Sequence, residues 1–396
     1  MYTLLKNKAL LLGCTLLLLP FQVKADDSGS CGQNVNYNYE ESTGKLTISG
    51  SGAMTDFTWD SMPWYNYIDE IKYVEIKEGV TTIGTYSFCN GFNISSVTIP
   101  NSVVSVGAYS FGSCSNSLTS IIIPKSVTSI GDNAFMNCVN LSFIVVESGN
   151  TVYDSRDNCN SVIETSSNTL LFGSNNTKIP ESVTSIASMA CYRRTGLTSL
   201  SIPAGVVSIG DYAFCSCSGL NSIIVEEGNT IYDSRENCNA IIETVTCTLV
   251  QGCNNTKIPN GITSIASSAF GDCSTLSSIT IPSTVTSVGN LAFSRCSSLS
   301  TVYIFAPSLE TYGYMAFAAN ADGRKIFVPE SSLSTYMEGW PDFADSIFPM
   351  EESRIEESTT IDKIVKGETY YFLSGQRIDS PHKGIYIVGG KKVIVK

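Results

Sequence analysis

The chain of 396 residues carries a formal net charge of -12 at pH 7, and its sequence pI is about 4.6. An acidic balance of this size argues against nucleic acid and anionic membranes as partners. Hydrophobic residues make up 43% of the chain and charged residues only 15%, which predicts a packed protein rather than a disordered one.

Residues 1–25 are typical of a secretory signal peptide. Lys6 and Lys8 precede an apolar stretch, and a small-residue cleavage site follows at Ala25. The apolar stretch is shorter than the ~18 residues of a spanning helix, and no later segment is long enough. A second interpretation makes Cys14 the lipidated residue of a lipoprotein, although few apolar residues precede it. We therefore expect an exported protein, at the cell surface or extracellular, without a transmembrane segment.

Residues 26–70 contain YNYEESTGKLTISGSGAM and a cluster of aromatic residues, and we expect them to form an N-terminal cap. Residues 71–348 then repeat an apolar-x-x-apolar-x-apolar pattern. Ile and Val dominate its last two positions, and β-branched side chains pack well in strands. Eight segments fit, and their apolar residues are Ile71/Val74/Ile76, Ile94/Val97/Ile99, Leu118/Ile121/Ile123, Leu141/Ile144/Val146, Leu197/Leu200/Ile202, Leu220/Ile223/Val225, Leu276/Ile279/Ile281 and Leu299/Val302/Ile304, with a weaker ninth copy at Ile326/Val328.

A proline follows many of these strands, and it ends the strand because it has no N–H to donate. A second apolar run then leads to an Ala-Phe pair, as in IPKSVTSIGDNAF, which we expect to fill the interior of each coil. The corner prolines recur every 23 or 24 residues, a period typical of a solenoid. Two intervals are longer by 33 residues, and we interpret the insertions, about 147–178 and 226–257, as β-hairpins projecting from one edge.

The insertions belong to a duplicated unit. Residues 124–202 align without a gap on residues 203–281, and GNTVYDSRDNCN in the first copy matches GNTIYDSRENCN in the second. In each copy an Asp-Ser-Arg-acid-Asn cluster offers oxygen ligands for Ca²⁺. The alternative is a tight turn in which Arg pairs with a neighbouring acid, and the arginine favours this second interpretation.

The chain closes with three further segments. Residues 328–343 break the repeat with a short amphipathic helix and Trp340, which predicts a C-terminal cap. An acidic linker is expected at 349–366 and a small β module at 367–396. The predicted fold is thus mainly β, a solenoid of stacked parallel strands with two inserted β-hairpins, capped at both ends, plus a small C-terminal β module.

Catalytic residues are scarce. The only histidine is His382, and Glu75 is the only acid at the outward strand positions, so we expect no catalytic residue, cofactor or metal. Cysteines recur three residues after the repeat Phe, as at Cys114, Cys138 and Cys296. This periodicity favours a ladder of buried free thiols, with disulfides between adjacent coils left open.

The units SVTSIGDNAFMNC and LTSIIIP resemble the BspA-like leucine-rich repeats of bacterial surface and secreted proteins, over about residues 31–345. One coil departs from the pattern, because Cys191 replaces the Phe and Arg194 replaces the Cys, and we expect looser packing there. The C-terminal LSGQRI and KGIYIVGGKKVIVK are similar to terminal modules of exported proteins, some of which act as type IX secretion sorting signals.

This resemblance implies an adhesin that binds a protein or cell-surface ligand. The outward strand positions form a Ser/Thr surface with apolar patches that favour protein contact. The candidate binding residues are Ile122, Phe143, Val145, Ile224, Tyr303 and Phe327. The inserted hairpins compete with this face as the binding surface. Two other functions remain open: a passive structural or surface-layer solenoid, and a polysaccharide-active β-solenoid enzyme.

Overall fold

The computed structural model describes residues 26–350 and, beyond them, only the backbone of strands within residues 359–395. The expected signal peptide with Cys14, and the side chain of His382, lie outside the described residues. The protein is a mainly β, parallel β-solenoid of about 12 turns, as the sequence predicted. An ordinary turn contributes one strand to each of two rows, which we name the ladder and the wall.

The ladder contains the strands of the apolar repeat. Their alternating side chains point into the core and out to solvent, as in Ser120–Ile123, where Ile121 and Ile123 are buried and Ile122 is exposed. The ladder strands are β3 (Lys45–Gly50), β5 (Tyr73–Ile76), β7 (Ser96–Thr98), β9 (Ser120–Ile123), β11 (Phe143–Val146), β16 (Ser199–Ile202), β18 (Ser222–Val225), β23 (Ser278–Ile281), β25 (Thr301–Ile304), β27 (Lys325–Val328) and β28 (Ile347–Pro349).

The wall is made of shorter strands, most of which follow the corner prolines. Within an uninterrupted part of the wall each strand pairs in parallel with the equivalent strand of the next coil, as Ser105 and Val106 do with Ser129 and Ile130. The wall strands are β4 (Gly52–Ala53), β6 (Val80–Ile83), β8 (Ser105–Val106), β10 (Ser129–Ile130), β15 (Ser185–Ile186), β17 (Ser208–Ile209), β22 (Ser264–Ile265), β24 (Ser287–Val288) and β26 (Thr311–Tyr312).

The Ala-Phe segments form the third side of each coil, which we call the tip. Where two ordinary coils are adjacent, the N–H of the tip Phe donates to the next coil, as from Phe111 to the carbonyl of Ala134 at 2.9 Å and from Phe293 to that of Ala316 at 2.7 Å. The Phe rings stack along the core, with 5.3 Å between the centroids of Phe88 and Phe111. Within this row the backbone alternates between right- and left-handed helical conformations, with positive φ at Tyr109 and equivalent positions.

The periodic cysteines form hydrogen bonds within this tip row. The Sγ of Cys138 donates to the carbonyl of Phe111 at 3.1 Å, and that of Cys296 to the carbonyl of Phe270 at 3.1 Å. The thiols of Cys114, Cys138, Cys217 and Cys296 thus each donate to a buried carbonyl of the preceding coil. All the cysteines that the structure describes are free, and all except Cys247 are buried. The prediction of a buried thiol ladder is confirmed.

Each insertion contains the expected hairpin. In the first, β12 (Tyr153–Asp154), β13 (Val162–Glu164) and β14 (Thr169–Phe172) are antiparallel. The second has β19 (Tyr232–Asp233), β20 (Ile241–Glu243) and β21 (Thr248–Gln251). The expectation that these hairpins project was wrong. Strand β14 pairs in parallel with β15, and β21 with β22, so each hairpin is stacked into the wall as an inserted coil.

The repeated Gly-Asn-Thr explains how the inserted coil is attached. The amide nitrogen of Asn150 donates to the carbonyls of Pro124 and Val127, while its oxygen accepts the N–H groups of Val152 and Tyr153. Asn229 forms the same four contacts in the second copy. One side chain therefore joins each insertion to the coil before it.

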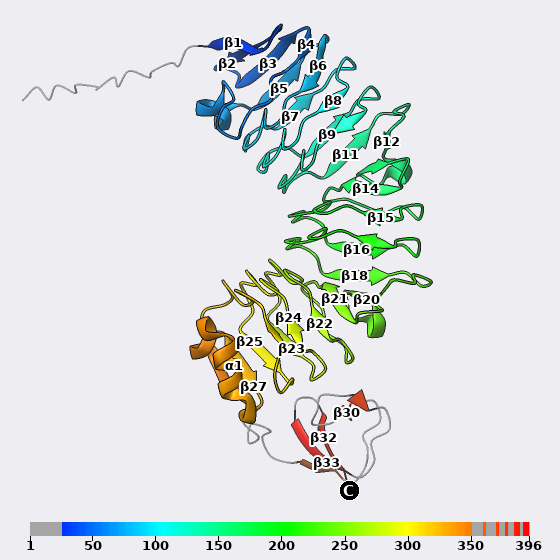
Figure 1. Ribbon diagram of the computed structural model, residues 1–396, viewed down its shortest axis with the longest axis vertical. Helices are drawn as coiled ribbons and strands as arrows, with labels where there is room; N and C mark the ends of the chain where they lie inside the picture. The colour runs from blue at the N-terminus through cyan, green and yellow to red at the C-terminus, as the bar shows by residue number, and fades with distance from the viewer. Residues whose placement is uncertain are drawn as a thin grey trace, which may run out of the picture.

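Both predicted caps are present. At the front, β1 (Asp27–Gly32) and β2 (Val35–Glu40) are antiparallel to each other and β2 is antiparallel to β3, while η1 (Tyr65–Glu70) follows the fully buried Trp64. At the back, η4 (Glu330–Ser332), α1 (Leu333–Gly339) and η5 (Pro341–Ser346) cover the last coil. Between the caps the coils form an arc (Figure 1). The antiparallel β1–β2 pair ends the parallel row at the front, and the helices cover the back.

The C-terminal strands form a sheet of their own, in the order β29-β33-β32-β30-β31. Strand β29 (Thr359–Ile361) lies in the segment expected to be a linker and pairs in parallel with β33 (Lys391–Val395). The other strands are β30 (Tyr370–Tyr371), β31 (Arg377–Ile378) and β32 (Gly384–Val388).

Candidate functional site

The structure divides the six predicted binding residues into two groups and one separate residue. The hydrogen-bonded ladder is interrupted between β7 and β9, between β11 and β16 and between β18 and β23. At the last two of these places an inserted coil contributes no ladder strand. Ile224 lies on β18 between these two interruptions, and it is exposed opposite Ser201 of β16. It therefore joins neither of the two patches described below.

The first ladder patch consists of Ile122, Phe143 and Val145. Ile122 lies directly opposite Val145 in the parallel register of β9 and β11, and Phe143 points outward from the start of β11. All three side chains are about half exposed, at 56%, 49% and 44%. Three large apolar groups that are adjacent and uncovered are typical of a contact surface.

The C-terminal ladder patch consists of Tyr303, Phe327 and Phe348 on β25, β27 and β28. The rings of Tyr303 and Phe327 are stacked with centroids 5.2 Å apart, and Phe348 follows at 6.2 Å from Phe327. The ammonium group of Lys325 lies 5.7 Å from the centre of the Phe348 ring. This patch combines an aromatic row with a cation, a combination enriched in protein interfaces.

Sequence reasoning missed Phe348, which it placed at the boundary of the repeat region. The alternating run Ile347-Phe348-Pro349 was the available signal, since it repeats the outward position of a ladder strand. Tyr73 on β5 is also exposed and outward, but its neighbours on that part of the ladder are charged. The carboxylate of Glu75 pairs there with Lys45 at 2.7 Å and Lys77 at 2.5 Å.

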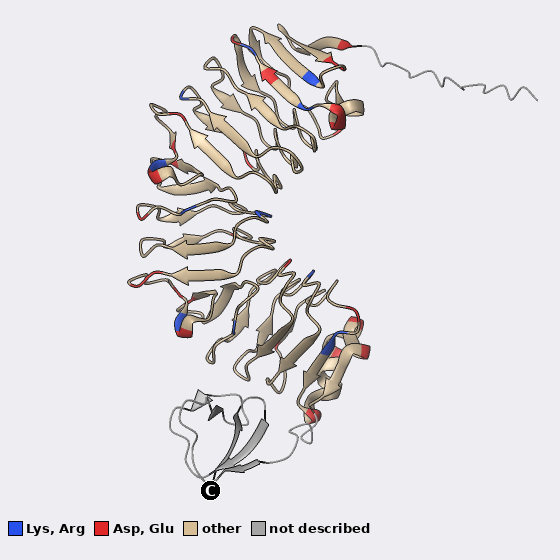
Figure 2. Cartoon of the chain, turned by 180° about the vertical axis from the view of Figure 1, so that it is seen from behind, with Lys and Arg blue, Asp and Glu red and all other residues tan. Residues whose placement is uncertain are grey.

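These contacts affect the ionisation of Glu75, and with it the suitability of this residue as a general acid. The hydrogen bonds from Lys45 and Lys77 lower the pKa of the Glu75 carboxyl, so it stays ionised. A general acid needs the opposite shift. Figure 2 shows that charged residues elsewhere lie mostly at the ends of the arc and on turns rather than along the strands. No group of three or more His, Cys, Asp or Glu among the described residues could hold a metal ion.

In each of the two Asp-Ser-Arg clusters, the arginine pairs with the aspartate of the same cluster. The guanidinium of Arg156 pairs with the carboxylate of Asp154, with 2.7 Å between Nη2 and Oδ2, and Arg235 pairs with Asp233 at 2.6 Å. The Ser155 hydroxyl accepts the N–H of Val146 and donates to the carbonyl of Ser161. The turn interpretation of this cluster is therefore supported, because its first acid pairs with the arginine and the Ser155 hydroxyl bonds to the backbone.

Arg194 also behaves differently from the expectation of loose packing. Its side chain is 2% exposed, and the guanidinium donates to the carbonyls of Gly173 at 2.7 Å, Cys138 at 2.8 Å and Phe135 at 3.0 Å. A cysteine at this position would satisfy the Phe135 carbonyl only if the coils were adjacent. Because the inserted coil separates them, the longer arginine spans the gap and its guanidinium is fully buried among these carbonyls, although it also lines a pocket.

No helix of the described residues is long and apolar enough to cross a membrane. No curated protein matches the chain. Several solved structures do. A leucine-rich repeat protein from Eubacterium ventriosum is 21% identical, with 78% of this chain and 80% of that chain covered and a TM-score of 0.37. A leucine rich cell surface protein from Faecalibacterium prausnitzii is 19% identical, with 84% and 97% covered and a TM-score of 0.48. The pneumococcal vaccine antigen PcpA is 18% identical, with 71% and 66% covered and a TM-score of 0.43.

A sequence family covers the repeats directly. The BspA type leucine rich repeat region matches residues 63–181, 171–251 and 241–340, in six copies. These ranges include the ladder strands from β5 to β27, the wall strands from β6 to β26 and both inserted coils. Because they cover more than half of the sequence, the chain belongs to the BspA type leucine-rich repeat family.

Proposed function

We propose that the protein is exported and acts as an adhesin-like binding protein, which contacts proteins on host or microbial surfaces through the outward face of its ladder. The observation that carries the proposal is the C-terminal ladder patch. Its three rings lie in one row beside Lys325, with Tyr303 and Phe348 exposed and Phe327 half-buried between them, on a sheet whose other outward positions are mostly small and polar. The first ladder patch offers a second apolar surface on the same face.

The tendency of exposed aromatic side chains to cause association supports this proposal. An exposed aromatic row is an association hazard unless a partner covers it. Strands with Ser or Thr outward would form the same ladder, as Ser201 of β16 and Thr280 of β23 do at positions equivalent to Tyr303. Residues 1–25, typical of a signal peptide, favour an extracellular setting in which such a partner is a surface protein.

The test is capture of matrix proteins and intact cells by immobilised protein. The variant Phe143→Ser/Tyr303→Ser/Phe327→Ser removes three outward side chains without touching the core. We expect it to lose at least about tenfold in affinity, because anchors of this kind carry most of the binding energy in an interface.

The matched control is Val104→Ser/Val207→Ser, which removes exposed apolar side chains that precede the wall strands β8 and β17. We expect this control to bind as the unmodified protein does. If the ladder variant retained every interaction, the ladder face would not be the binding surface. If neither protein captured any ligand, a passive structural role would replace adhesion.

A further inference from the structure

The inserted coils interrupt the tip row as well as the ladder. In adjacent coils the N–H of the tip Phe donates to the next coil. Phe214 precedes the second insertion, and no described residue accepts its N–H or that of Tyr212. The same holds for Phe135 and Asn133 before the first insertion. Each junction therefore leaves a short row of unpaired backbone donors, because the inserted coil has no Ala-Phe tip segment to accept them.

At each junction a pocket lies where the next tip segment would otherwise be. The second-junction pocket has a volume of about 350 Å³ and lies between the tip at Gly210–Cys215 and the segment Ala266–Ser268, with Val250 and Gln251 between them. The first-junction pocket measures about 430 Å³. Both volumes are at the lower end of the range of roughly 300–1,000 Å³ for small-molecule sites.

The duplication supplies a comparison within one chain. Positions 79 residues apart line the two pockets, and both retain the acid, Asp132 in the first and Asp211 in the second. The other side chains differ. The second pocket has polar groups where the first has apolar ones: Gln251 replaces Phe172 and Ser268 replaces Met189, while Tyr212 replaces Asn133.

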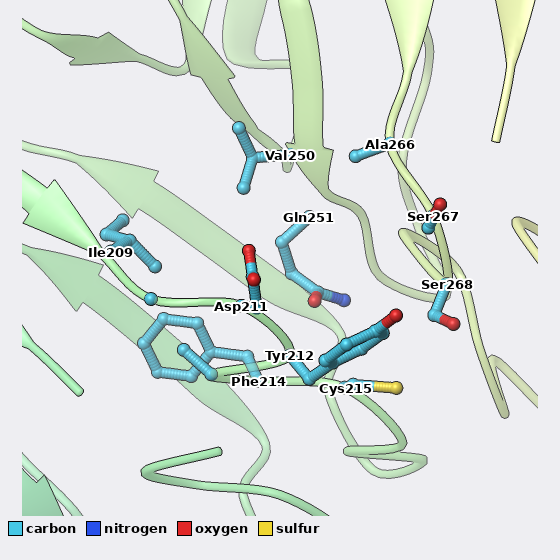
Figure 3. Close-up of a pocket in the computed structure, with 12 residues that line it drawn as sticks. Ile209, Asp211, Tyr212, Phe214, Cys215, Val250, Gln251, Ala266, Ser267 and Ser268 are labelled. Carbon is cyan, nitrogen blue, oxygen red and sulfur yellow. The ribbon is translucent and has the colours of Figure 1, made fainter. Parts of the chain in front are cut away.

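In the first-junction pocket the Phe172 ring packs edge-on against Phe135 with centroids 5.5 Å apart. In the second, the Gln251 amide donates to the carbonyls of Gly252 at 2.8 Å and Ala269 at 2.9 Å, which fixes its orientation. Its oxygen accepts no hydrogen bond from the described residues. Figure 3 shows Asp211, Gln251 and the Tyr212 ring among the side chains that line the pocket.

The chemistry of this lining restricts the ligand. The N–H groups of Tyr212 and Phe214 need acceptors, whereas the Asp211 carboxylate and the Gln251 oxygen need donors. An anion would meet the Asp211 charge, and a cation would meet the positive ends of the N–H dipoles. A neutral polyhydroxyl compound supplies donors and acceptors on every carbon, and its apolar ring face suits the half-exposed Tyr212 ring. We infer that the second-junction pocket binds one neutral sugar residue of a glycan.

The experiment uses the full chain and saturation-transfer NMR with glucose, galactose, mannose, fucose, N-acetylglucosamine and N-acetylgalactosamine, each up to about 50 mM, which detects even millimolar affinity. We expect at least one sugar to bind. Asp211→Asn and Gln251→Phe should each weaken that sugar about tenfold or more, since each removes a hydrogen-bonding partner. Asp211 is exposed, so Asp211→Asn leaves the fold intact.

Asp132→Asn at the first junction is the matched control, and it should leave sugar binding unchanged. The ladder variant Phe143→Ser/Tyr303→Ser/Phe327→Ser should also bind the sugar normally, which separates this inference from the proposed adhesion. Absence of binding to all six sugars would overturn the inference. So would sugar binding that both Asp211→Asn and Gln251→Phe leave intact, or occupation of the pocket by sulfate or a peptide and by no sugar.

Discussion

Arg194 is a buried cation without a carboxylate partner among its hydrogen bonds. Three carbonyl groups solvate it instead, from Phe135, Cys138 and Gly173. Two of these belong to the coil before the first insertion and one to the inserted coil itself. The planar guanidinium donates in several directions at once, which the single ammonium of a lysine cannot reproduce. This residue therefore connects three successive coils across the gap.

Replacing Arg194 with lysine should lower the free energy of unfolding by about 2–4 kcal/mol, because at least one buried carbonyl loses its donor and the charge is less well solvated. Urea unfolding followed by circular dichroism measures the change. Arg193→Lys, at the neighbouring half-buried position, should stay within about 0.5 kcal/mol. Equal effects of the two substitutions would contradict the proposed connection.

The thiols provide a second test at this scale. Burial raises the pKa of Cys296 to about 12 and that of Cys191 to about 11, and thiolates are the reactive form. Because both pKa values in the folded protein lie above the ordinary thiol value of 9.0, these thiols stay protonated at neutral pH and up to about pH 10. Iodoacetamide at pH 8 should therefore label them only after unfolding, as followed by peptide mass spectrometry.

The half-buried Cys247 is the internal reference for this labelling, and it should react first. Reduction before labelling should change nothing, because the described cysteines are free. A mass loss of two hydrogens that dithiothreitol restores would instead reveal a disulfide between adjacent coils.

At the scale of elements, each inserted coil uses a side chain to replace a backbone hydrogen bond that an ordinary coil would form. The phenol of Tyr153 accepts the N–H of Ile130 at 3.2 Å, and the phenol of Tyr232 accepts that of Ile209 at 3.1 Å. In an unbroken wall the next strand would supply a backbone carbonyl. A side-chain oxygen replaces it here because the wall is interrupted before β12 and before β19.

Tyr153→Phe and Tyr232→Phe should each lower the free energy of unfolding by about 1–2 kcal/mol, the cost of an unsatisfied buried N–H. The two sites lie in different copies of the unit, so their effects should add within about 0.5 kcal/mol in the double variant. Equilibrium denaturation of the four proteins tests this, and Tyr65→Phe, on an exposed ring, is the control. Strong non-additivity would show that the two junctions unfold as one.

Elements with a strong period were predictable, and the junctions were not. Ile121 and Ile123 alternate with outward residues in the sequence, so the ladder and its register could be read directly. The insertion was recognised as a hairpin from its turns. Its place in the wall depends on pairing between Leu170 and Ile186, which no local pattern encodes. The pocket residues Asp211 and Gln251 were missed for the same reason, since a missing coil brings them together.

At the scale of the molecule, the C-terminal cap covers the end of the stack. Trp340 is 3% exposed, packs against Phe317 and Tyr312 with centroids 5.1 Å away in each case, and donates to the carbonyl of Gly313. It covers the last tip, which has no following coil. An uncovered end of this kind offers unpaired backbone groups to another chain.

Trp340→Ala should lower the free energy of unfolding by about 3–5 kcal/mol through the cavity and the exposed coil. It should also increase self-association, as measured by light scattering after size-exclusion chromatography. Trp59→Ala is the control, because that ring is 55% exposed on the opposite cap. A monomeric Trp340→Ala protein of ordinary stability would mean that the helices, rather than this ring, close the stack.

The duplicated unit gives the gene for this protein a simple way to change length. Its 79 residues begin at the corner Pro124 and end where the next corner begins at Pro203, so both boundaries have the same structural environment. Unequal recombination between the two copies can therefore add or delete a unit while leaving both caps in place. Each event would also add or delete one inserted coil, so length variants of this protein would differ in the number of inserted coils and of junction pockets together.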